Sequence, residues 1–368
     1  MNTPSSWLWL LALFTIAGFI ETIFYGQISA FTPLYLPSLG VPEPDINAWT
    51  GAIVAFSSAI GIPFLPLWGA LADRYARKPI IIRSFVVHLM AVILMLLSGS
   101  VWVFAIGRAV TSFALGNSGL MMTTLSERAP AQRLGLAFSI MNGAPPLGAF
   151  LGPLVGGPIV DRLGFPTLLA INGVLMLAVI FALGFGYQDT FRGADRTPIL
   201  RMAADSVRII WRSARLRALF PALFVLFAGW MLAFTYAPRA IMALYRGSEP
   251  NTAVGVVLAA GGLVTLVLSP IVGALADRFG HWRVLIAGAM VTVALWPIPA
   301  LTPELVSFAI AWAALNGVMS GVFAISFSVL SSSAASDVRG RVMSFAYLPV
   351  NVGGLVGPAF GSVVTQES

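Results

Sequence analysis

The chain has 368 residues, of which 58% are hydrophobic and only 10% are charged, and its formal net charge is +7. Ordinary soluble domains carry about 25% charged residues, so this composition excludes a water-soluble globule and predicts a protein embedded in a lipid bilayer. Cysteine is absent, which excludes disulfides and thiolate metal sites. The two histidines, His88 and His281, lie in an apolar stretch and a charged turn, so we predict neither a metal site nor a cofactor.

Eleven apolar runs, each of about 18 to 30 residues, follow one another along the chain. An α-helix of that length crosses the hydrocarbon core of a bilayer. We therefore predict an all-α membrane protein with eleven transmembrane helices. The runs cover residues 7–36, 48–71, 80–98, 101–125, 134–160, 165–187, 216–245, 251–273, 283–300, 304–333 and 341–364.

A polar, arginine-rich stretch at 188–215 separates the first six runs from the last five. It predicts an N-terminal six-helix bundle at 1–187, a basic linker at 188–215 and a C-terminal bundle of five helices at 216–364. The segment 196–217 can form an amphipathic helix on an anionic membrane surface or a solvated linker. The composition favours the solvated linker.

The basic residues collect on one side of the predicted membrane. With the N-terminus inside, all but four of the 21 lysines and arginines fall in cytoplasmic segments. Cytoplasmic loops of membrane proteins are enriched in such residues, so we predict a cytoplasmic N-terminus and no nucleic-acid partner. We expect a monomer in a cell membrane, namely the cytoplasmic membrane of a bacterium.

Two stretches of sequence occur twice. GALADR is found at 69–74 and again at 273–278, and GAFLGPLVGG at 148–157 is similar to GGLVGPAFGS at 353–362. The chain therefore consists of two related halves in the same orientation. Parallel repeats of this kind are typical of transporters, which place the substrate near the midplane between the halves and alternate between two access states.

The loop GALADRYARKP at 69–79 resembles the signature between the second and third helices of the major facilitator superfamily. The resemblance extends over nearly the whole chain and implies two helical bundles related by a parallel repeat. Members of the superfamily usually have twelve helices, and the sequence stops at Ser368, after the eleventh, so the twelfth is absent from the prediction. In the family that helix is peripheral and supports the C-terminal half.

The charged residues of this loop are, by resemblance, a cytoplasmic gate that stabilises the outward-open state and breaks on inward opening. Asp73 can pair with arginines of neighbouring loops, such as Arg133 or Arg339. A role in topology and helix capping alone is the alternative. The predicted gate residues are Gly69, Asp73, Arg74, Arg77, Lys78, Arg133, Asp277, Arg278 and Arg339.

The run 148–157 is similar to the fifth-helix signature of the antiporter branch, which includes drug:proton antiporters. Gly148, Gly152 and Gly156 fall four residues apart and line one helix face, where another backbone can approach closely. Pro153 removes a helical hydrogen bond and bends the helix, and Gly157 completes the pattern. We expect this face to seal the interface between the halves; plain small-residue packing is the alternative.

Glu21 lies midway along the first run and is the carboxylate deepest within the predicted spans. An ionised carboxylate there costs at least about 2.5 to 3.5 kcal/mol, so it should face a cavity, take a partner or hold a proton. Arg108 resembles the arginine of the superfamily's fourth-helix signature. Its depth in the membrane, counted from the rise per helical residue, brings its side chain within reach of Glu21. We predict that Glu21 carries the proton, that Arg108 stabilises its carboxylate, and that a cationic substrate competes with the proton. A static buried pair is the alternative.

Methionine, aromatic and polar residues on the helices that face the cleft in the family are candidates for substrate contact. Pockets lined by methionine and aromatic side chains can rearrange to accept many different ligands. The candidates are Tyr25, Asn117, Met121, Asn142, Trp230, Phe234 and Asn316. Arg239, toward the outer end of the seventh run, can attract an anionic group.

We predict a secondary active transporter and not an enzyme, because a Walker loop, a G-x-S-x-G elbow and paired catalytic carboxylates are all missing from the sequence. The expected activity is proton-coupled efflux of small amphipathic or drug-like compounds by alternating access. Two alternatives stay open: a uniporter or symporter of metabolites or sugars, and a non-transporting membrane protein.

Overall fold

The computed structural model describes residues 6–64, 76–114, 117–189, 208, 211–333 and 348–364. Within them the regular elements are helices, and no strand occurs. The N-terminal half contains α1 (Trp7–Tyr35), α2 (Ile46–Gly61), α4 (Arg77–Leu96), α5 (Val101–Val110), α6 (Asn117–Arg128), α7 (Leu134–Leu163) and α8 (Phe165–Gly186). The C-terminal half contains α10 (Ala214–Leu244), α11 (Pro250–Phe279), α12 (His281–Leu295), α13 (Ile298–Leu301), α14 (Leu305–Ser333) and α16 (Leu348–Val364).

The described part of the chain has nine helical segments long and apolar enough to cross a membrane. Each corresponds to one of the predicted runs, and α16, of 17 residues, corresponds to the last run. The predicted run at 101–125 is divided into α5, a short 3-10 helix η4 (Thr111–Ala114) and α6. The prediction of an all-α membrane protein is confirmed, with the fourth run interrupted near its middle.

Glycines mark two of the tight turns between consecutive helices. Gly164 ends α7 with φ of 82° and Gly280 ends α11 with φ of 94°. Only glycine adopts this left-handed conformation without steric cost, so each helix stops there and the next begins at once. Serines start other helices: the hydroxyls of Ser6 and Ser213 accept hydrogen bonds from Trp9 N and Leu216 N.

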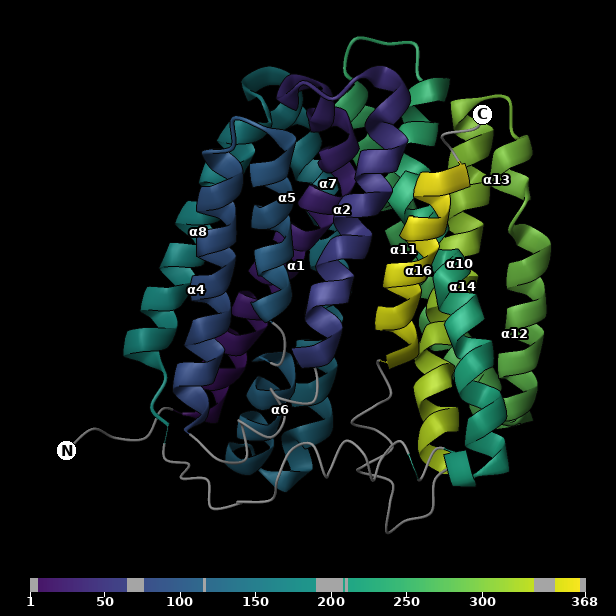
Figure 1. The fold of residues 1–368 in the computed structure, drawn as a ribbon. Helices are drawn as coiled ribbons and strands as arrows, with labels where there is room; N and C mark the ends of the chain where they lie inside the picture. Colours follow the sequence, from purple (N-terminus) through teal and green to yellow (C-terminus); the bar gives the residue numbers. More distant parts are fainter. Residues whose placement is uncertain are drawn as a thin grey trace.

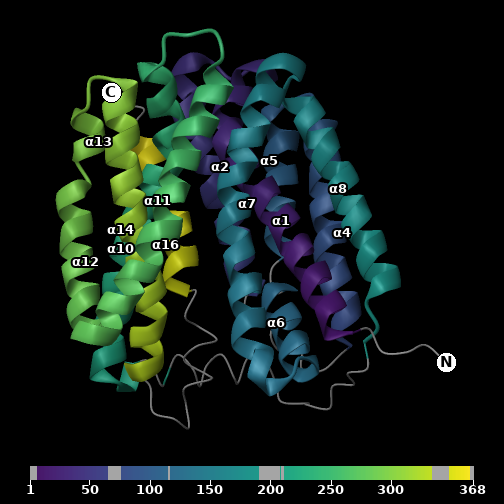
Figure 2. The ribbon, with the colours of Figure 1, turned by 180° about the vertical axis from the view of Figure 1, so that it is seen from behind.

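The helices form two bundles that stand side by side (Figure 1; Figure 2 from behind). Equivalent helices pack alike, since α1 lies against α7 and α10 lies against α16. Between the bundles, α7 packs on α11 and α2 packs on α16. The helices α7 and α16 carry the two copies of the glycine-rich sequence, so the repeat seen in the sequence is a repeat of packing. Most of the predicted linker at 188–215 falls outside the described residues.

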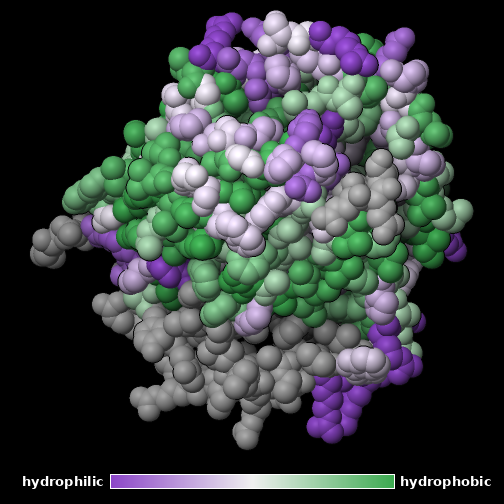
Figure 3. Space-filling view, turned by 45° about the horizontal axis from the view of Figure 1, so that its top comes forward, coloured by the Kyte–Doolittle hydropathy of each residue, from purple (hydrophilic) through white to green (hydrophobic). Residues whose placement is uncertain are grey.

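Large apolar side chains cover the outside of the bundles. Phe185 is 85% exposed, Leu301 77% and Val293 68%. Figure 3 shows hydrophilic residues gathered at the top of the molecule above a broad hydrophobic band. A soluble protein rarely leaves such patches uncovered, whereas lipid solvates them. We call the end at which α1 begins the N-terminal face and the other end the opposite face.

Candidate transport site

A buried polar cluster lies inside the N-terminal half, around Glu21 of α1. Asn117 of α6 donates a hydrogen bond of 2.7 Å from Nδ2 to Glu21 Oε2. The other carboxylate oxygen, Oε1, lies 3.7 Å from Nδ1 of His88 on α4. The Glu21 side chain is 10% exposed and that of His88 is fully buried. Three helices far apart in sequence therefore meet at one carboxyl group.

Tyr25, one turn after Glu21, connects the cluster to the end of α5. Its hydroxyl donates to the carbonyl oxygen of Thr111 at 3.3 Å and lies 3.0 Å from His88 Nε2. The rings of Phe24 and Tyr25 meet the His88 ring edge to face, at centroid distances of 5.5 and 5.2 Å. These contacts hold the imidazole in one orientation.

Arg108 has different partners from the one expected. Its Nη1 donates to the Thr111 hydroxyl at 3.0 Å, and its Cζ lies 5.9 Å from the centre of the Tyr25 ring. The residues that contact the Glu21 carboxylate are Asn117 and His88, so Arg108 reaches the cluster through Tyr25 and Thr111. Thr111, three residues after Arg108, begins η4. Its hydroxyl therefore holds the Arg108 guanidinium near the end of α5.

His88 was missed by sequence reasoning, which treated it as a lone structural histidine. The signal was its position: it is the chain's one histidine within an apolar run. Membrane spans rarely contain ionisable residues, and those they contain usually face an interior partner. Its partner is on another helix, which the sequence of its own helix does not show.

The aromatic candidates form a column in the C-terminal half. Trp230 of α10 lies parallel to Trp312 of α14, with a centroid distance of 5.9 Å, and Phe308 lies parallel to Trp312 at 6.2 Å. Phe234 lies 6.1 Å from Trp230. Asn316 donates to the Trp312 carbonyl oxygen at 2.9 Å. Of these candidates, the structure brings Trp230, Phe234 and Asn316 together around Trp312.

Two other cavity candidates lie apart from this column. Met121 is buried in the N-terminal half and Asn142 is exposed on α7. Arg239, expected to attract an anionic group, pairs with Glu43 of the N-terminal half at 3.1 Å. Its charge therefore already has a partner in this state.

The halves meet closely toward the opposite face. Asp161 at the end of α7 accepts four hydrogen bonds of 2.6 to 3.1 Å from the backbone and side chains of Asn251 and Thr252, at the start of α11. A carboxylate is favoured there because the first backbone N–H groups of a helix have no partner within it. Figures 1 and 2 show the ribbons of the two halves converging at this face and diverging toward the N-terminal face.

The glycines of the 148–157 run divide their contacts between the two halves. A Cβ atom on Gly148 or Gly152 would lie 2.6 or 2.7 Å from backbone oxygens of α1, and one on Gly156 would meet Phe31 and Gln27 of the same helix. This corrects the expectation that their face seals the interface between halves, because that face packs within the N-terminal half. The contact with α11 is made by the next positions, where Gly157 meets Asn251 and Pro153 meets Gly255.

Part of the predicted gate lies outside the described residues, namely Gly69, Asp73, Arg74 and Arg339. Arg77 forms two hydrogen bonds of 2.7 Å with Glu127 at the end of α6, which holds the pKa of the Glu127 carboxyl below its usual value. Lys78 donates from its backbone N to Asp189 and from Nζ to the Gly184 carbonyl oxygen. These two predicted gate residues therefore bind partners within their own half.

The remaining gate candidates also have local contacts. Asp277 lies 3.4 Å from His281, and the Arg278 guanidinium stands over the Phe279 ring at 5.2 Å. The backbone N of Arg133 donates to the Pro130 carbonyl oxygen. Glu127 was not singled out from the sequence, where it follows the end of an apolar run.

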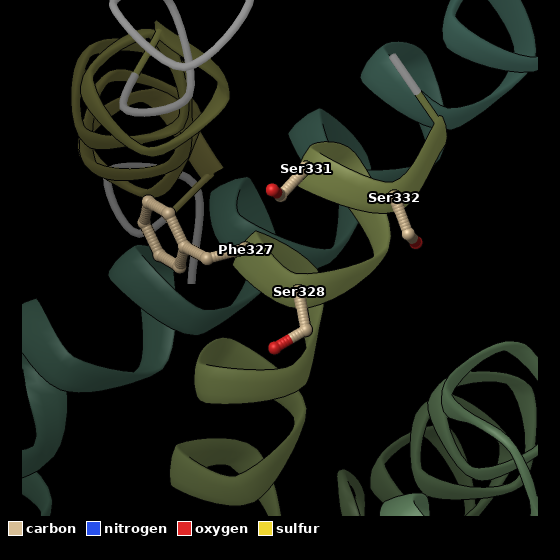
Figure 4. A pocket seen from close by; sticks show the side chains of 4 residues that line it. All are labelled: Phe327, Ser328, Ser331 and Ser332. Carbon is tan, nitrogen blue, oxygen red and sulfur yellow. The ribbon is translucent and has the colours of Figure 1, made fainter. Parts of the chain in front are cut away.

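A recess of about 450 Å³ lies at the N-terminal-face end of α14 and is lined by Phe327, Ser328, Ser331 and Ser332. Figure 4 shows that all four side chains come from successive turns of α14, with Phe327 and Ser331 pointing to the same side. The lining includes neither a charged side chain nor a member of the Glu21 cluster, so we do not place the transport site there.

The fold and the buried cluster together define a multi-pass membrane protein of two repeated helical bundles with an ionisable site inside the first. The sequence profile of the Major Facilitator Superfamily matches residues 13–358. The chain belongs to this superfamily, a family of membrane transporters.

Similar proteins come from several bacteria. The chain is 26% identical to "Multidrug resistance protein MdtG" of Klebsiella pneumoniae (strain 342), over 100% of this chain and 89% of the relative. It is 24% identical to the protein of the same name from Escherichia coli (strain SMS-3-5 / SECEC), over 100% and 90%.

Among solved structures, the nucleoside transporter NupG has a TM-score of 0.77 at 14% identity, covering 98% of this chain and 92% of that chain. A bacterial homolog of the human lysosomal transporter Spinster, in an inward-facing and unoccupied conformation, has a TM-score of 0.73 at 17% identity, covering 96% and 80%. At such identities the likeness shows the fold alone.

Proposed function

We propose that this protein exports small amphipathic or drug-like compounds in exchange for protons, by alternating access of its two halves. The observation that carries the proposal is Glu21, a carboxyl group inside a membrane-spanning helix with a small exposed fraction and a polar partner. The names of the multidrug resistance relatives support the substrate class.

Glu21 suits exchange between a proton and a cation. An ionised carboxylate within the bilayer is costly, and the hydrogen bond from Asn117 offsets only part of that cost. A proton or a cationic substrate neutralises it, and the two compete for the same oxygen atoms. Arg108 acts on this site through Tyr25 and Thr111, because it contacts those two residues.

The contacts between the halves support alternating access. We place the N-terminal face in the cytoplasm, because the arginine-rich segments flank the helices at that face. In this orientation, Asp161 and Arg239 hold the halves together on the outer side. Opening to the outside then requires these contacts to break while the cytoplasmic ends approach.

The roles of Asp73 and Arg339 in a cytoplasmic gate stay predictions. Formation of that gate would accompany closure of the cytoplasmic side, as the family resemblance implies. We also propose that the protein acts as a monomer in a bacterial cytoplasmic membrane.

The test is proton release from the purified full chain on addition of tetraphenylphosphonium, a lipophilic cation, measured with a pH-sensitive dye. We expect wild-type protein to release protons, and Glu21→Gln to bind the cation without release. Glu304→Gln, which alters an exposed carboxyl group before α14, is the matched control and should behave as wild type.

Equal release from Glu21→Gln and wild-type protein would exclude Glu21 as the coupling group. Failure of folded wild-type protein to bind any of a panel of lipophilic cations would overturn the proposed substrate class and favour a transporter of neutral solutes.

A further inference from the structure

We propose that Glu21 and His88 together form the proton-binding site, in which one proton is held between Glu21 Oε1 and His88 Nδ1. The inference rests on the proton-coupled transport proposed above and adds a second group to its site. Four observations support it: the hydrogen bonds around the imidazole, an unpartnered nitrogen, the surrounding charges and the path of access.

The contact of Tyr25 with Thr111 favours one ring nitrogen of His88 as the carrier of the proton. A tyrosine hydroxyl has one proton to donate, and that of Tyr25 is directed to the Thr111 carbonyl oxygen. When the Tyr25 proton is donated to Thr111, the Tyr25 oxygen accepts at its contact of 3.0 Å with His88 Nε2. The neutral imidazole then carries its proton on Nε2, and Nδ1 presents a lone pair.

That lone pair faces another acceptor. His88 Nδ1 is buried without a hydrogen-bond partner, and the nearest carboxylate oxygen, Glu21 Oε1, lies 3.7 Å away. This distance is longer than a hydrogen bond, as expected for two acceptors that face each other without a proton between them. A buried acceptor without a partner costs about 1 to 3 kcal/mol. One proton added between the two atoms removes this cost for both groups.

The surrounding charges favour one proton over two. Arg108 on α5 and Arg83, five residues earlier on α4, bring positive charge to the side of His88, while Glu21 is the carboxylate that faces it. Asn117 and Thr111 add only neutral groups, and α8, which also packs on α4, contains no ionisable residue. An imidazolium beside a protonated Glu21 would be a buried cation without a counter-charge.

Access to the pair is through Glu21. His88 is fully buried, whereas Glu21 retains an exposed fraction of 10%. Of the two groups, the carboxylate is therefore the one that takes up the proton first in this proposal, and it then shares the proton with Nδ1. On release it leaves to water from the carboxyl group, and the site returns to a carboxylate and a neutral imidazole, with no other bond changed.

The first test uses ¹⁵N-labelled histidine in the full-length protein. The chain contains two histidines, so His281→Gln leaves His88 as the single labelled ring. We expect an Nε2–H tautomer at high pH and a change at Nδ1 as the pH falls. Adding Glu21→Gln should move the midpoint of that change by about one pH unit or more, because the two groups titrate together. The proposal of a shared proton would be overturned by a proton on Nδ1 at high pH, or by an unchanged midpoint in Glu21→Gln.

The second test measures proton release induced by tetraphenylphosphonium as a function of pH. Because His88→Gln removes the acceptor that helps to hold the proton, the midpoint of release should move to lower pH, by about one unit. His281→Gln, at the exposed start of α12 in the other half, is the matched control. If Glu21→Gln abolishes proton release but His88→Gln leaves the pH profile unshifted, the shared proton is overturned and the proposed function stands. If Glu21→Gln releases protons as wild type does, the proposed function itself is overturned.

Discussion

The two halves of the molecule share helix packing but differ in what they bury. Among the described residues, the buried charged and histidine side chains are Glu21, Arg77, His88 and Arg108, all in the N-terminal half. The buried polar side chains described in the C-terminal half are uncharged. That half instead contains the column of parallel rings around Trp312.

Comparison of the halves shows which positions of the duplicated chain are constrained by helix packing. Positions at which helices touch keep small residues in both halves, as in α7 against α1 and α16 against α10. A side chain there would meet the backbone of the facing helix. Interior positions without such a contact are free to diverge, and the two halves differ there: the described N-terminal half buries ionisable groups among its rings, whereas the C-terminal half has the parallel rings around Trp312 beside uncharged polar side chains.

The largest effect should come from the contacts that the halves share. Gly152→Leu and Gly357→Leu should each lower the free energy of unfolding by about 3 kcal/mol or more, since a Cβ at either site meets a carbonyl oxygen of the facing helix, Ile23 or Ala228. The measurement is the amount of monodisperse protein recovered by size-exclusion chromatography in mild detergent. Gly143→Leu, in open space on α7, is the control and should be recovered normally. Tolerance of only one of the two substitutions would show that the halves are packed differently.

The next effect concerns the contact between the halves at the opposite face. Asp161→Asn replaces a carboxylate that accepts four hydrogen bonds from the start of α11, and hydrogen bonds to charged groups contribute about 1.5 to 3 kcal/mol. We expect the population open at the opposite face to rise about tenfold or more. The chain has no cysteine, so spin labels at Leu163→Cys and Glu249→Cys can report the separation by pulsed electron paramagnetic resonance.

Arg162→Gln, which alters the exposed neighbouring charge, is the control for this experiment. An identical distance distribution in Asp161→Asn and wild-type protein would show that this carboxylate does not hold the halves together.

A smaller effect should distinguish the affinity for the substrate from its coupling to protons. Trp230→Leu removes a ring from the aromatic column, and an aromatic pair contributes about 0.5 to 1.5 kcal/mol, so the dissociation constant for tetraphenylphosphonium should rise about two- to tenfold. The number of protons released per bound cation should not change, because the proton site lies in the other half. Isothermal titration in two buffers of different ionisation enthalpy measures both quantities. Trp211→Leu, 65% exposed before α10, is the control, and a changed proton count in Trp230→Leu would contradict the division of roles.

The smallest effect concerns the N-terminal face. The pKa of Glu127 lies below its usual value of 4.5 because Arg77 donates hydrogen bonds to it, so this pair contributes stability above that pH and loses it as the pH falls through the lowered pKa. Glu127→Gln should therefore lower thermal stability slightly at neutral pH, by less than about 1 kcal/mol for a carboxylate that is half exposed. The difference from wild type should shrink as the pH falls below 4.5 and vanish once the pH is below the lowered pKa of Glu127. A difference that persists in acid would mean that the side chain acts by packing.

Much of the fold was predictable because it depends on local composition. Apolar runs long enough to span a bilayer become helices, and the duplicated glycines become equivalent contacts. The burial of Glu21 also followed from the sequence, since an acid in the middle of an apolar run has few places to lie. Its partners did not follow: Arg108 was expected, and Asn117 and His88 make the contacts.

Local composition and repeats in the sequence are enough to show that the chain crosses a membrane repeatedly, that its halves are copies and that one of them places a carboxyl group within a span. The direction in which each helix turns its faces is visible only in the folded molecule. There the glycines at 148–156 pack on α1, and His88 points at Glu21. The physical reason is that periodicity defines a face relative to its own helix axis. The rotation of that face toward a neighbour depends on packing between helices far apart in the chain, as in the contact of Glu21 with Asn117, 96 residues further along.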